Sequence, residues 1–376
     1  MKQRPVVALV NQTVLSYRAS FHIRLSKLLA REEIHYRLIS GNRLPSGIIP
    51  EVDAICIPAR SLGRTVWQNL FSVTGDTDLL IMDQGVRQFA LYPLFLKHIL
   101  GKQKLAFWGH GKNFQARNPN SPEERLKRYL TRHAHWFFAY NNMSARVVRE
   151  LGFPENRTTI MMNAIDTSGL SSAKAALTDA DHQHLRSELG IRTNNVGVYT
   201  GAMYADKRMP FLLDACREIR KRVPDFEMIF IGGGDDAPLV EREAQKYPWM
   251  HFVGYKNNEE KVPYWALAKV FLMPGAVGLV ILDSFALETP MITTAVPTHG
   301  PEIDYLENGV NGIMVTARDS VSDFANAAVH ILQDEEERQL LVKGCRRSAP
   351  KYTVEKSAQL FADGIQSALQ ARHYFG

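Results

Sequence analysis

Two adjacent cations, Lys207 and Arg208, stand in a short loop between an apolar run that ends at Gly201 and a helical pattern that begins near Pro210. A lysine and an arginine placed in this way could neutralise a diphosphate, because a guanidinium can bind two oxygens at once. The alternative is an exposed loop in which both charges are solvated. The loop alone supports the two interpretations equally.

Three glycines end the next apolar run, at Gly232, Gly233 and Gly234. Glycines at the end of a strand allow either a ligand or a tight turn to approach the backbone closely. They lack the G-x-G-x-x-G spacing, so a dinucleotide site is not expected. By themselves they are weak evidence of a ligand.

A third loop, from Gly275 to Gly278, runs into a helical pattern that begins at Leu279. Free backbone N–H groups and the positive end of the helix dipole make such a junction suitable for an anion. Asp283 lies about one turn into this helix, where its carboxylate could accept hydrogen bonds from sugar hydroxyls. The alternative is that this acid only complements the helix dipole.

In the first half of the chain, His110 occupies a comparable position at the end of an apolar run. Its small neighbours, Gly109 and Gly111, would let a substrate come close to the imidazole. A single histidine is more often structural than catalytic, and both roles stay open. Histidine, cysteine and carboxylate residues do not cluster at ligand spacing anywhere in the sequence, so no metal site is predicted.

Alternating strands and helices must position these loops. In the first half, the patterns predict strands at 4–11, 35–40, 54–58, 79–83, 104–110 and 135–140, and helices at 20–33, 90–100 and 122–133. In the second half, they predict strands at 195–201, 227–234, 251–255, 270–275, 291–295 and 312–315, with a helix at 210–223. Such alternation favours parallel sheets with helices on both faces. Ligands of these sheets bind beyond the carboxyl ends of the strands, where the loops lie.

The alternation is interrupted once, and the interruption divides the chain into two domains. Residues 169–194 are predicted to be a linker, because their Ser, Ala and Thr follow no clear periodicity. We therefore expect one domain at 1–168 and a second at 195–352. Two such domains would offer a cleft between them.

The composition is that of an ordinary globular protein, with 45% hydrophobic and 22% charged residues. It excludes a disordered chain, a collagen-like repeat and a small disulfide scaffold. The three cysteines have neither metal-ligand nor redox spacing, and the first apolar run is too short for a signal peptide. No run approaches the roughly 18 apolar residues of a membrane span. These features predict a cytoplasmic protein.

The net charge of +6 is unevenly distributed. Residues 1–165 carry 23 Lys and Arg against 11 Asp and Glu, a net charge of +12, and the remaining residues carry 22 against 28, a net charge of −6. A basic half predicts contact with something anionic, such as phospholipid headgroups or a lipid-linked phosphate, unless the basic surface is simply solvated. Nucleic acid is not expected as a partner, because no binding module accompanies the charge.

The aromatic and basic segments 64–71 and 88–97 could supply contact with the inner face of the cell membrane. A core helix explains the second segment equally well.

The order and spacing of these motifs resemble those of the retaining family-four glycosyltransferases of GT-B fold, bacterial polysaccharide and lipopolysaccharide type. The resemblance of 201–312 to their donor domain rests on the strand-end glycine and lysine loop, the glycine strand end, the acid-bearing helix, and the closing segments His299-Gly-Pro-Glu-Ile and Asn308-Gly-Val-Asn-Gly. Three segments of the first half resemble motifs of bacterial members: Tyr17-Arg-Ala-Ser-Phe, Trp108-Gly-His-Gly and Asn163-Ala-Ile-Asp.

The resemblance implies an α/β protein of GT-B fold, in which two Rossmann-like α/β/α domains face a central cleft. It makes 1–168 the acceptor-binding domain and 195–352 the nucleotide-sugar donor domain, with the last helix, about 353–376, packing back onto the first. It implies a retaining transferase of bacterial surface polysaccharide synthesis, with a nucleotide-diphosphate sugar as co-substrate and a glycan or lipid-linked acceptor. No cofactor and no metal are expected. The location would be cytoplasmic or peripheral at the inner face of the membrane.

The resemblance also implies roles for individual residues. The candidates for catalysis are His110, Lys207 and Asp283. The candidates for donor binding are Gly201, Lys207, Arg208, Gly233, Tyr255, Gly275, Gly278, Leu279 and Asp283. Lys207 and the backbone N–H groups of Gly278 and Leu279 are expected to stabilise the leaving diphosphate.

Two departures from the family pattern bear on activity. Of the two glutamates that members carry eight positions apart, the first falls on Gly275 and the second on the shorter Asp283; the arginine after the strand-end glycine is Ala202. Rearranged donor contacts in an active enzyme are the favoured interpretation. The alternatives are a non-catalytic nucleotide-sugar-binding partner protein and a sugar-nucleotide epimerase of the same fold.

Overall fold

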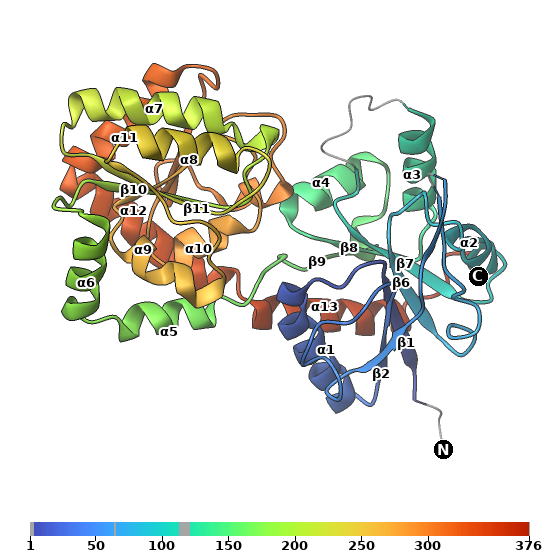
Figure 1. The fold of residues 1–376 in the computed structure, drawn as a ribbon. Coiled ribbons are helices and arrows are strands. Elements are labelled where there is room, and N and C mark those ends of the chain that lie inside the picture. The colour runs from blue at the N-terminus through green and yellow to red at the C-terminus, as the bar shows by residue number, and fades with distance from the viewer. Residues whose placement is uncertain (1–3, 64, 113–120, 376) are drawn as a thin grey trace. The chain divides into compact units, whose positions relative to one another are not determined.

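The computed structural model describes residues 4–63, 65–112 and 121–375 (Figure 1). The chain forms two compact units. Unit 1 comprises residues 1–166 and 352–376, and unit 2 comprises residues 167–351. Unit 1 is therefore built from two separate stretches of sequence.

Unit 1 contains a seven-stranded, all-parallel sheet in the order β3-β2-β1-β6-β7-β8-β9. Its strands are β1 (Val6–Asn11), β2 (His35–Ser40), β3 (Asp53–Cys56), β6 (Leu79–Asp83), β7 (Lys104–Gly109), β8 (Trp136–Ala139) and β9 (Thr158–Ile160). A separate antiparallel hairpin joins β4 (Arg60–Leu62) to β5 (Thr65–Trp67). The helices are α1 (Ala19–Arg31), α2 (Leu91–Ile99), α3 (Pro122–Arg132), α4 (Asn142–Glu150) and α13 (Val354–Gln370), with short 3-10 turns η1 (Ser16–Arg18) and η2 (Glu155–Arg157).

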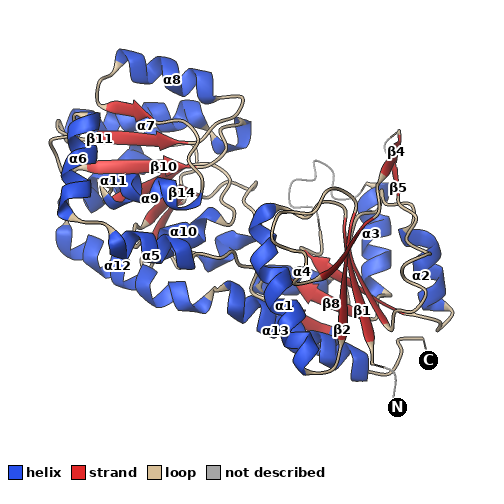
Figure 2. Cartoon of the chain, turned by 60° about the horizontal axis from the view of Figure 1, so that its bottom comes forward, coloured by secondary structure: helices blue, strands red, loops and turns tan. Residues whose placement is uncertain are grey.

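Helices cover both faces of this sheet (Figure 2). Side chains of α1 and α13 form one core with alternate residues of the strands, and those of α2, α3 and α4 form a second core on the opposite face. The C-terminal helix belongs to the first core, because the Phe361 ring packs 5.5 Å from Phe21 of α1 and 4.2 Å from Phe138 of β8. The central strands β1, β6, β7 and β8 are buried on both faces, which explains why each appears in the sequence as a nearly continuous apolar run.

Unit 2 contains a six-stranded parallel sheet in the order β12-β11-β10-β13-β14-β15. Its strands are β10 (Val196–Thr200), β11 (Glu227–Ile231), β12 (Met250–Phe252), β13 (Val270–Met273), β14 (Met291–Thr294) and β15 (Gly312–Val315). Its helices are α5 (Ser168–Ala176), α6 (Asp179–Leu189), α7 (Met209–Arg222), α8 (Ala237–Lys246), α9 (Val262–Ala266), α10 (Val280–Ala286), α11 (Val321–Gln333) and α12 (Glu335–Ser348). The 3-10 turns are η3 (Ala205–Lys207), η4 (Asn258–Lys261), η5 (Pro301–Tyr305) and η6 (Ala349–Lys351).

The stretch expected to be a linker, 169–194, is largely helical and belongs to unit 2. Helix α6 begins with a capping box, in which Thr178 and Asp181 satisfy each other's backbone N–H groups, and ends at Gly190 in the left-handed conformation. Helix α5 is held by Lys174, whose Nζ lies 2.7 Å from the carbonyl oxygen of Leu287. Polar capping and this tether, rather than an apolar stripe, account for the two helices.

The aromatic segments of unit 1 combine core and surface positions. On α2, Leu91, Leu94 and Phe95 are buried in the core, whereas Leu96 is 54% exposed. Phe89 is also 54% exposed, and its ring lies 5.9 Å from Trp67 of the hairpin. Arg64 lies outside the described residues. The helix is thus a core element that also presents apolar side chains to solvent.

Candidate active site

The glycines at the ends of β10 and β11 pack backbone against backbone. The Gly201 N–H donates to the carbonyl oxygen of Ile231 at 3.0 Å, and the Met203 N–H donates to that of Gly233 at 2.8 Å. A Cβ on Gly232, whose φ is +145°, would come within 1.9 Å of the Gly201 carbonyl oxygen. Glycine is therefore required here to seat the lysine loop, whereas the Cα of Gly233 faces open space.

Lys207 lies in the short turn η3 and is buried, with 9% of its surface exposed. Its ammonium donates to the carbonyl oxygen of Ala276 in the loop after β13. Burial lowers the pKa of Lys207 to about 8, and neighbouring Asp206 partly opposes that decrease. The structure thus holds a desolvated lysine beside the third glycine loop, where an anionic ligand would favour its charged form.

Gly275 and Lys207 are pressed together. A Cβ on Gly275 would lie 2.5 Å from the Lys207 Cα and 2.2 Å from the Asp206 carbonyl oxygen. The Ala276 N–H donates to that same oxygen at 2.8 Å. A glutamate at position 275, as in the family pattern, has no room in this arrangement.

Arg208 is directed to other partners. Its guanidinium lies 2.9 Å from Asp319 Oδ1 and 3.2 Å from Thr294 Oγ1, and it covers the Phe211 ring at 4.3 Å. The backbone of Arg208 adopts the left-handed conformation, with φ of 59°. Arg208 could therefore bind a diphosphate only after giving up these contacts.

Asp283 is buried in α10 and pairs with a lysine that the sequence analysis did not single out. Its Oδ2 lies 2.6 Å from Lys261 Nζ, and only 5% and 13% of the two side chains are exposed. Burial raises the pKa of Asp283, and the charge and hydrogen bond of Lys261 oppose that rise. The second oxygen, Oδ1, is buried and makes no hydrogen bond to any described residue, so it can still accept one.

His299 organises the loop that carries Gly278 and Leu279. Its Nδ1 accepts from the Val277 N–H at 3.0 Å, and its Nε2 lies 2.7 Å from the Thr294 carbonyl oxygen, to which it donates. These two bonds require the neutral imidazole, and burial lowers the pKa of His299 accordingly. A Cβ on Gly278 would meet open space, which leaves this loop accessible to a ligand.

Tyr255 follows β12 and is 75% exposed. Its ring therefore contributes to donor binding only if a ligand covers it.

In unit 1, the three motif segments of the first half converge on Arg18. The Arg18 guanidinium donates to Asn163 Oδ1 at 2.6 Å and lies over the rings of Trp108 and Tyr140 at 5.5 Å each. Ser20 Oγ, nearby in the sequence, donates to Asp166 Oδ2 at 2.9 Å. The sequence contained Arg18 within a recognised motif, but its spacing gave no sign of this central position.

His110 stands at the end of β7 with its ring edge-on to Tyr140, the centroids 4.4 Å apart. Burial, with smaller effects of Lys127 and Arg18, lowers the pKa of His110 to about 4. The imidazole is therefore neutral at physiological pH. Of its two glycine neighbours, Gly109 leaves open space, whereas Gly111 is needed because a Cβ there would lie 2.6 Å from Val148.

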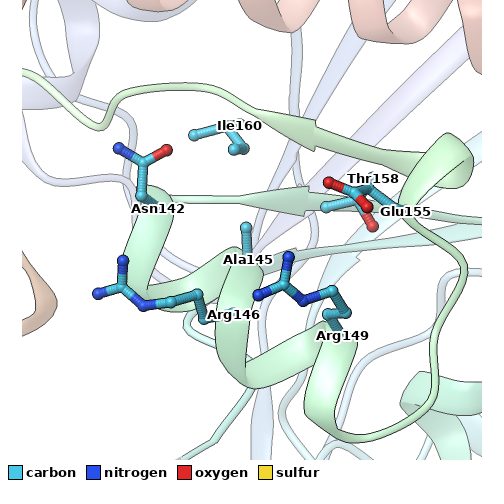
Figure 3. Close-up of a pocket in the computed structure, with 7 residues that line it drawn as sticks. All are labelled: Asn142, Ala145, Arg146, Arg149, Glu155, Thr158 and Ile160. Carbon is cyan, nitrogen blue, oxygen red and sulfur yellow. The ribbon is translucent and has the colours of Figure 1, made fainter.

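A pocket of about 450 Å³ lies between α4 and the edge strand β9 of unit 1 (Figure 3). Arg146 and Arg149, three residues apart on α4, line one side of it, and Glu155 and Thr158 line the other. Two guanidinium groups in one pocket favour an anionic ligand such as a phosphate.

Among the described residues, one group has the geometry to hold a metal ion: His330, Asp334 and Glu337, at the junction of α11 and α12. Asp334 already caps α12 by accepting from the Glu337 N–H at 2.9 Å. None of the three is a predicted site residue, and exposed groups of this kind commonly carry no ion.

Part of the second unit is similar to a family of known proteins. Residues 194–334 match the family described as Glycosyl transferases group 1. The matched segment contains the lysine loop, the glycine loops and Asp283, so the candidate donor-binding residues lie within it.

Individual relatives extend this result. The chain is 27% identical over 196 residues to alpha-monoglucosyldiacylglycerol synthase of Acholeplasma laidlawii, covering 50% of this chain and 47% of that protein. It is 21% identical over 285 residues to alpha-D-kanosaminyltransferase of Streptomyces kanamyceticus, covering 73% of this chain and 72% of the relative. The first alignment thus spans about half of the relative's length.

The fold is also that of solved glycosyltransferases. HepE of Anabaena, solved in complex with UDP, superposes with a TM-score of 0.72 at 15% identity, covering 96% of this chain and 100% of that one. The expected α/β GT-B fold with two parallel-sheet domains is confirmed. Within the described part of the chain, no helix combines the length and apolar character needed to span a membrane.

Proposed function

We propose that the chain is a retaining glycosyltransferase that moves a sugar from a nucleotide-diphosphate sugar to a hydroxyl of a glycan or lipid-linked acceptor in bacterial surface polysaccharide synthesis. The observation that carries the proposal is buried Lys207, whose ammonium meets the Gly275–Gly278 loop inside the matched domain. The UDP complex of HepE supports a nucleotide sugar as the donor.

In the proposed reaction, the bond between the sugar C1 and the diphosphate oxygen breaks, and a bond from C1 to the acceptor oxygen forms on the same face. The acceptor hydroxyl proton passes to the departing diphosphate. Lys207 and the backbone N–H groups of Gly278 and Leu279 stabilise the negative charge on that leaving group. Asp283 accepts a hydrogen bond from a donor hydroxyl through Oδ1. A lysine thus supplies the positive charge at the diphosphate, and we expect no divalent cation to be needed.

The acceptor is assigned to unit 1. The net charge of +12 in residues 1–165 and the Arg146–Arg149 pocket (Figure 3) suit an acceptor that carries a phosphate. The exposed Phe89 and Leu96 support contact of this unit with an anionic membrane surface.

A thermal-shift screen against UDP, GDP, ADP, CMP and their sugar conjugates tests the donor site. We expect one nucleoside diphosphate to raise the melting temperature selectively, also in the presence of EDTA. Lys207→Ala should abolish that shift, and Lys221→Ala, which removes an exposed lysine of the same unit, should preserve it. No shift with any nucleotide would contradict the proposal.

Turnover distinguishes the alternatives. Nucleotide binding without sugar transfer to any acceptor would indicate a non-catalytic partner protein. This outcome is tested because Gly275 stands where members of the family carry a glutamate. Sugar-nucleotide conversion that needs no acceptor would indicate an epimerase.

A further inference from the structure

Segment 371–375 directly follows α13, and two cations of unit 1 hold its backbone. Lys104 Nζ, at the start of β7, donates to the carbonyl oxygen of Ala371 at 2.8 Å. The Arg157 guanidinium, in η2, donates to the carbonyl oxygen of Arg372 at 3.1 Å. The segment is therefore bound through its carbonyl groups, and the side chains that bind it are positively charged.

His373 connects this segment to α2 through a chain of hydrogen bonds between imidazoles. The Phe375 N–H donates to His373 Nδ1 at 3.2 Å, so the proton of this ring is on Nε2. His373 Nε2 lies 3.1 Å from His98 Nδ1, which therefore accepts, and 3.1 Å from the carbonyl oxygen of Gln103. His98 Nε2 donates in turn to the carbonyl oxygen of His133 at 3.0 Å. Both rings are neutral in this chain, because each donates through one nitrogen and accepts through the other.

A third imidazole, His135, lies against the same ring just before β8. Its ring stacks on that of His373, with the centroids 5.7 Å apart. His135 Nε2 donates to the Ala368 carbonyl oxygen at 2.8 Å, and Nδ1 accepts from the Arg157 guanidinium at 3.4 Å. This ring is neutral too, since a proton on Nδ1 would face the guanidinium. We call these three side chains the imidazole cluster: His98, His135 and His373.

The surroundings of the imidazole cluster oppose its protonation. Burial is the main cause that lowers the pKa of His98 and of His135 to about 4 each. His373 and Arg157 lower the pKa of His98 further, and Lys104 and Arg157 do the same for His135. Hydrogen bonds to backbone carbonyl oxygens raise both pKa values in part. A proton added to a ring therefore breaks a hydrogen bond of the cluster and places a positive charge beside other cations.

The remaining ionisable groups leave this balance positive. The ring of His133 stacks on Phe375, with the centroids 6.2 Å apart, and the ring of Tyr374 lies 5.3 Å from the guanidinium that binds the segment. Asp78 is the acid whose charge acts on the neighbouring lysine, and its carboxylate accepts from the Val6 N–H at 2.8 Å. Protonated rings would thus meet two cations and one acid.

We propose that segment 371–375 is a pH-sensitive latch, which the imidazole cluster holds on unit 1 while its rings are neutral and releases when they are protonated. A histidine returned to water has a pKa near 6.5, so acid favours the released form. Each ring that release returns to water should increase the equilibrium constant for release by up to about tenfold per pH unit below pH 6.5. The inference does not depend on the proposed function.

The mobility of the segment can be measured on the full chain with a nitroxide label and electron paramagnetic resonance. The label is attached to Arg372→Cys, because the Arg372 side chain is exposed and its contact with the guanidinium is made by the backbone. Cys56 is exposed and is replaced by Ser, whereas Cys216 and Cys345 are buried and stay unlabelled. A second chain carries the label on Lys356→Cys, an exposed position of α13 that reports whether the helix stays folded.

Between pH 7.5 and pH 5, we expect the label at position 372 to change from immobile to mobile while the label at position 356 does not change. His373→Gln keeps an N–H donor and cannot be protonated, so its label should stay immobile at a pH where the wild-type segment is mobile. His373→Lys places a permanent charge in the cluster and should release the segment already at pH 7.5. His184→Gln, which removes an exposed histidine of α6, is the matched control and should behave as the wild type does.

A label at position 372 that is immobile down to pH 5, or already mobile at pH 7.5, would overturn the proposal. Equal mobilisation at position 356 would show that acid unfolds α13, and a latch would then not be needed to explain the result. His98→Gln is the second test variant. An unchanged pH dependence in both His373→Gln and His98→Gln would assign the release to groups outside the imidazole cluster and would also overturn the proposal.

Discussion

Gly275 lies so close to Lys207 that a Cβ on the glycine would come within 2.5 Å of the Lys207 Cα. The contact sets the position of the buried lysine against the loop after β13, where its ammonium reaches the Ala276 carbonyl oxygen. The absence of a glutamate at position 275 and the buried position of Lys207 are therefore consequences of the same close packing. Reintroducing a side chain at position 275 must displace the lysine.

Substitution of Gly275 should therefore damage the donor site rather than repair it. We expect Gly275→Ala to lower the stability of the chain by about 1–3 kcal/mol, because backbone atoms must move to admit the methyl group. Gly275→Glu should be worse and should weaken nucleotide binding. Chemical denaturation and nucleotide titration measure the two effects. A Gly275→Glu variant with improved turnover would show that the loop adapts to the family's acid.

The Lys261–Asp283 pair should be needed for stability as well as for donor binding. Lys261→Met leaves the buried Asp283 carboxylate without its cation, and we expect a loss of about 3–5 kcal/mol. Lys221→Met, which breaks the exposed pair with Glu218, should cost less than about 1 kcal/mol. Urea denaturation of both variants makes the comparison. Equal losses would mean that the buried pair contributes no more than a surface one.

Nucleotide affinity should fall as the pH rises through the pKa of Lys207, which is about 8. The ammonium is mostly charged at pH 7 and loses its proton above pH 8, so the dissociation constant should increase by up to about tenfold per pH unit there. Calorimetric titration between pH 6.5 and 9.5 tests this expectation. Lys207→Met should bind the nucleotide weakly, and its dissociation constant should not increase with pH. A similar increase in that variant would show that a group other than Lys207 causes the pH dependence.

Acid should destabilise unit 1 through its buried histidines. Burial lowers the pKa of His22 to about 3 and those of His98, His110 and His135 to about 4. The unfolded chain binds protons at these sites below pH 6.5, so stability falls from there down to the folded pKa values, by about 1.4 kcal/mol per pH unit for each histidine. Asp83 acts in the opposite direction, because burial raises its pKa to about 6 and protonation below that pH stabilises the folded chain. Its effect on stability offsets part of the loss caused by one histidine.

Hydrogen exchange followed by mass spectrometry measures this effect in each unit of the intact chain. Between pH 7 and pH 5, after correction for intrinsic exchange rates, we expect protection to fall in peptides of β1, α1 and β8 more than in those of β10 and α7. His22→Gln should reduce the difference. Equal loss in both units would rule out these histidines as the cause.

The sheets were predictable because their central strands are buried on both faces. Runs rich in apolar residues marked each strand of unit 2 and six of the seven in unit 1. The edge strand β9 was missed, because its three residues, Thr158–Ile160, are too short to show a pattern. Helices α5 and α6 were missed because they are polar and small-residue-rich, although the Thr178 and Asp181 capping box stood in the sequence.

The loops that carry the candidate residues could be predicted from the sequence, but the contacts of these residues could not. Strand-end position singled out Lys207 and His110, and Asp283 was singled out as the acid of the helix that follows the third loop. The bonds from Lys261 to Asp283 and from Arg18 to Asn163 join residues 22 and 145 positions apart, and only the folded chain brings them together. Arg208 was predicted to bind the donor because it follows Lys207 in the sequence. In the folded chain its guanidinium is bound to Asp319 and Thr294 instead.

The return of α13 to unit 1 has a consequence for biosynthesis. The chain leaves unit 1 after Asp166, completes unit 2, and only then supplies the helix that places Phe361 and Ile365 in the first core. On the ribosome, unit 2 therefore emerges whole before unit 1 can close. A nascent or truncated chain that stops short of Val354 would leave the apolar surface around Phe21 uncovered, and there a chaperone or protease would recognise it.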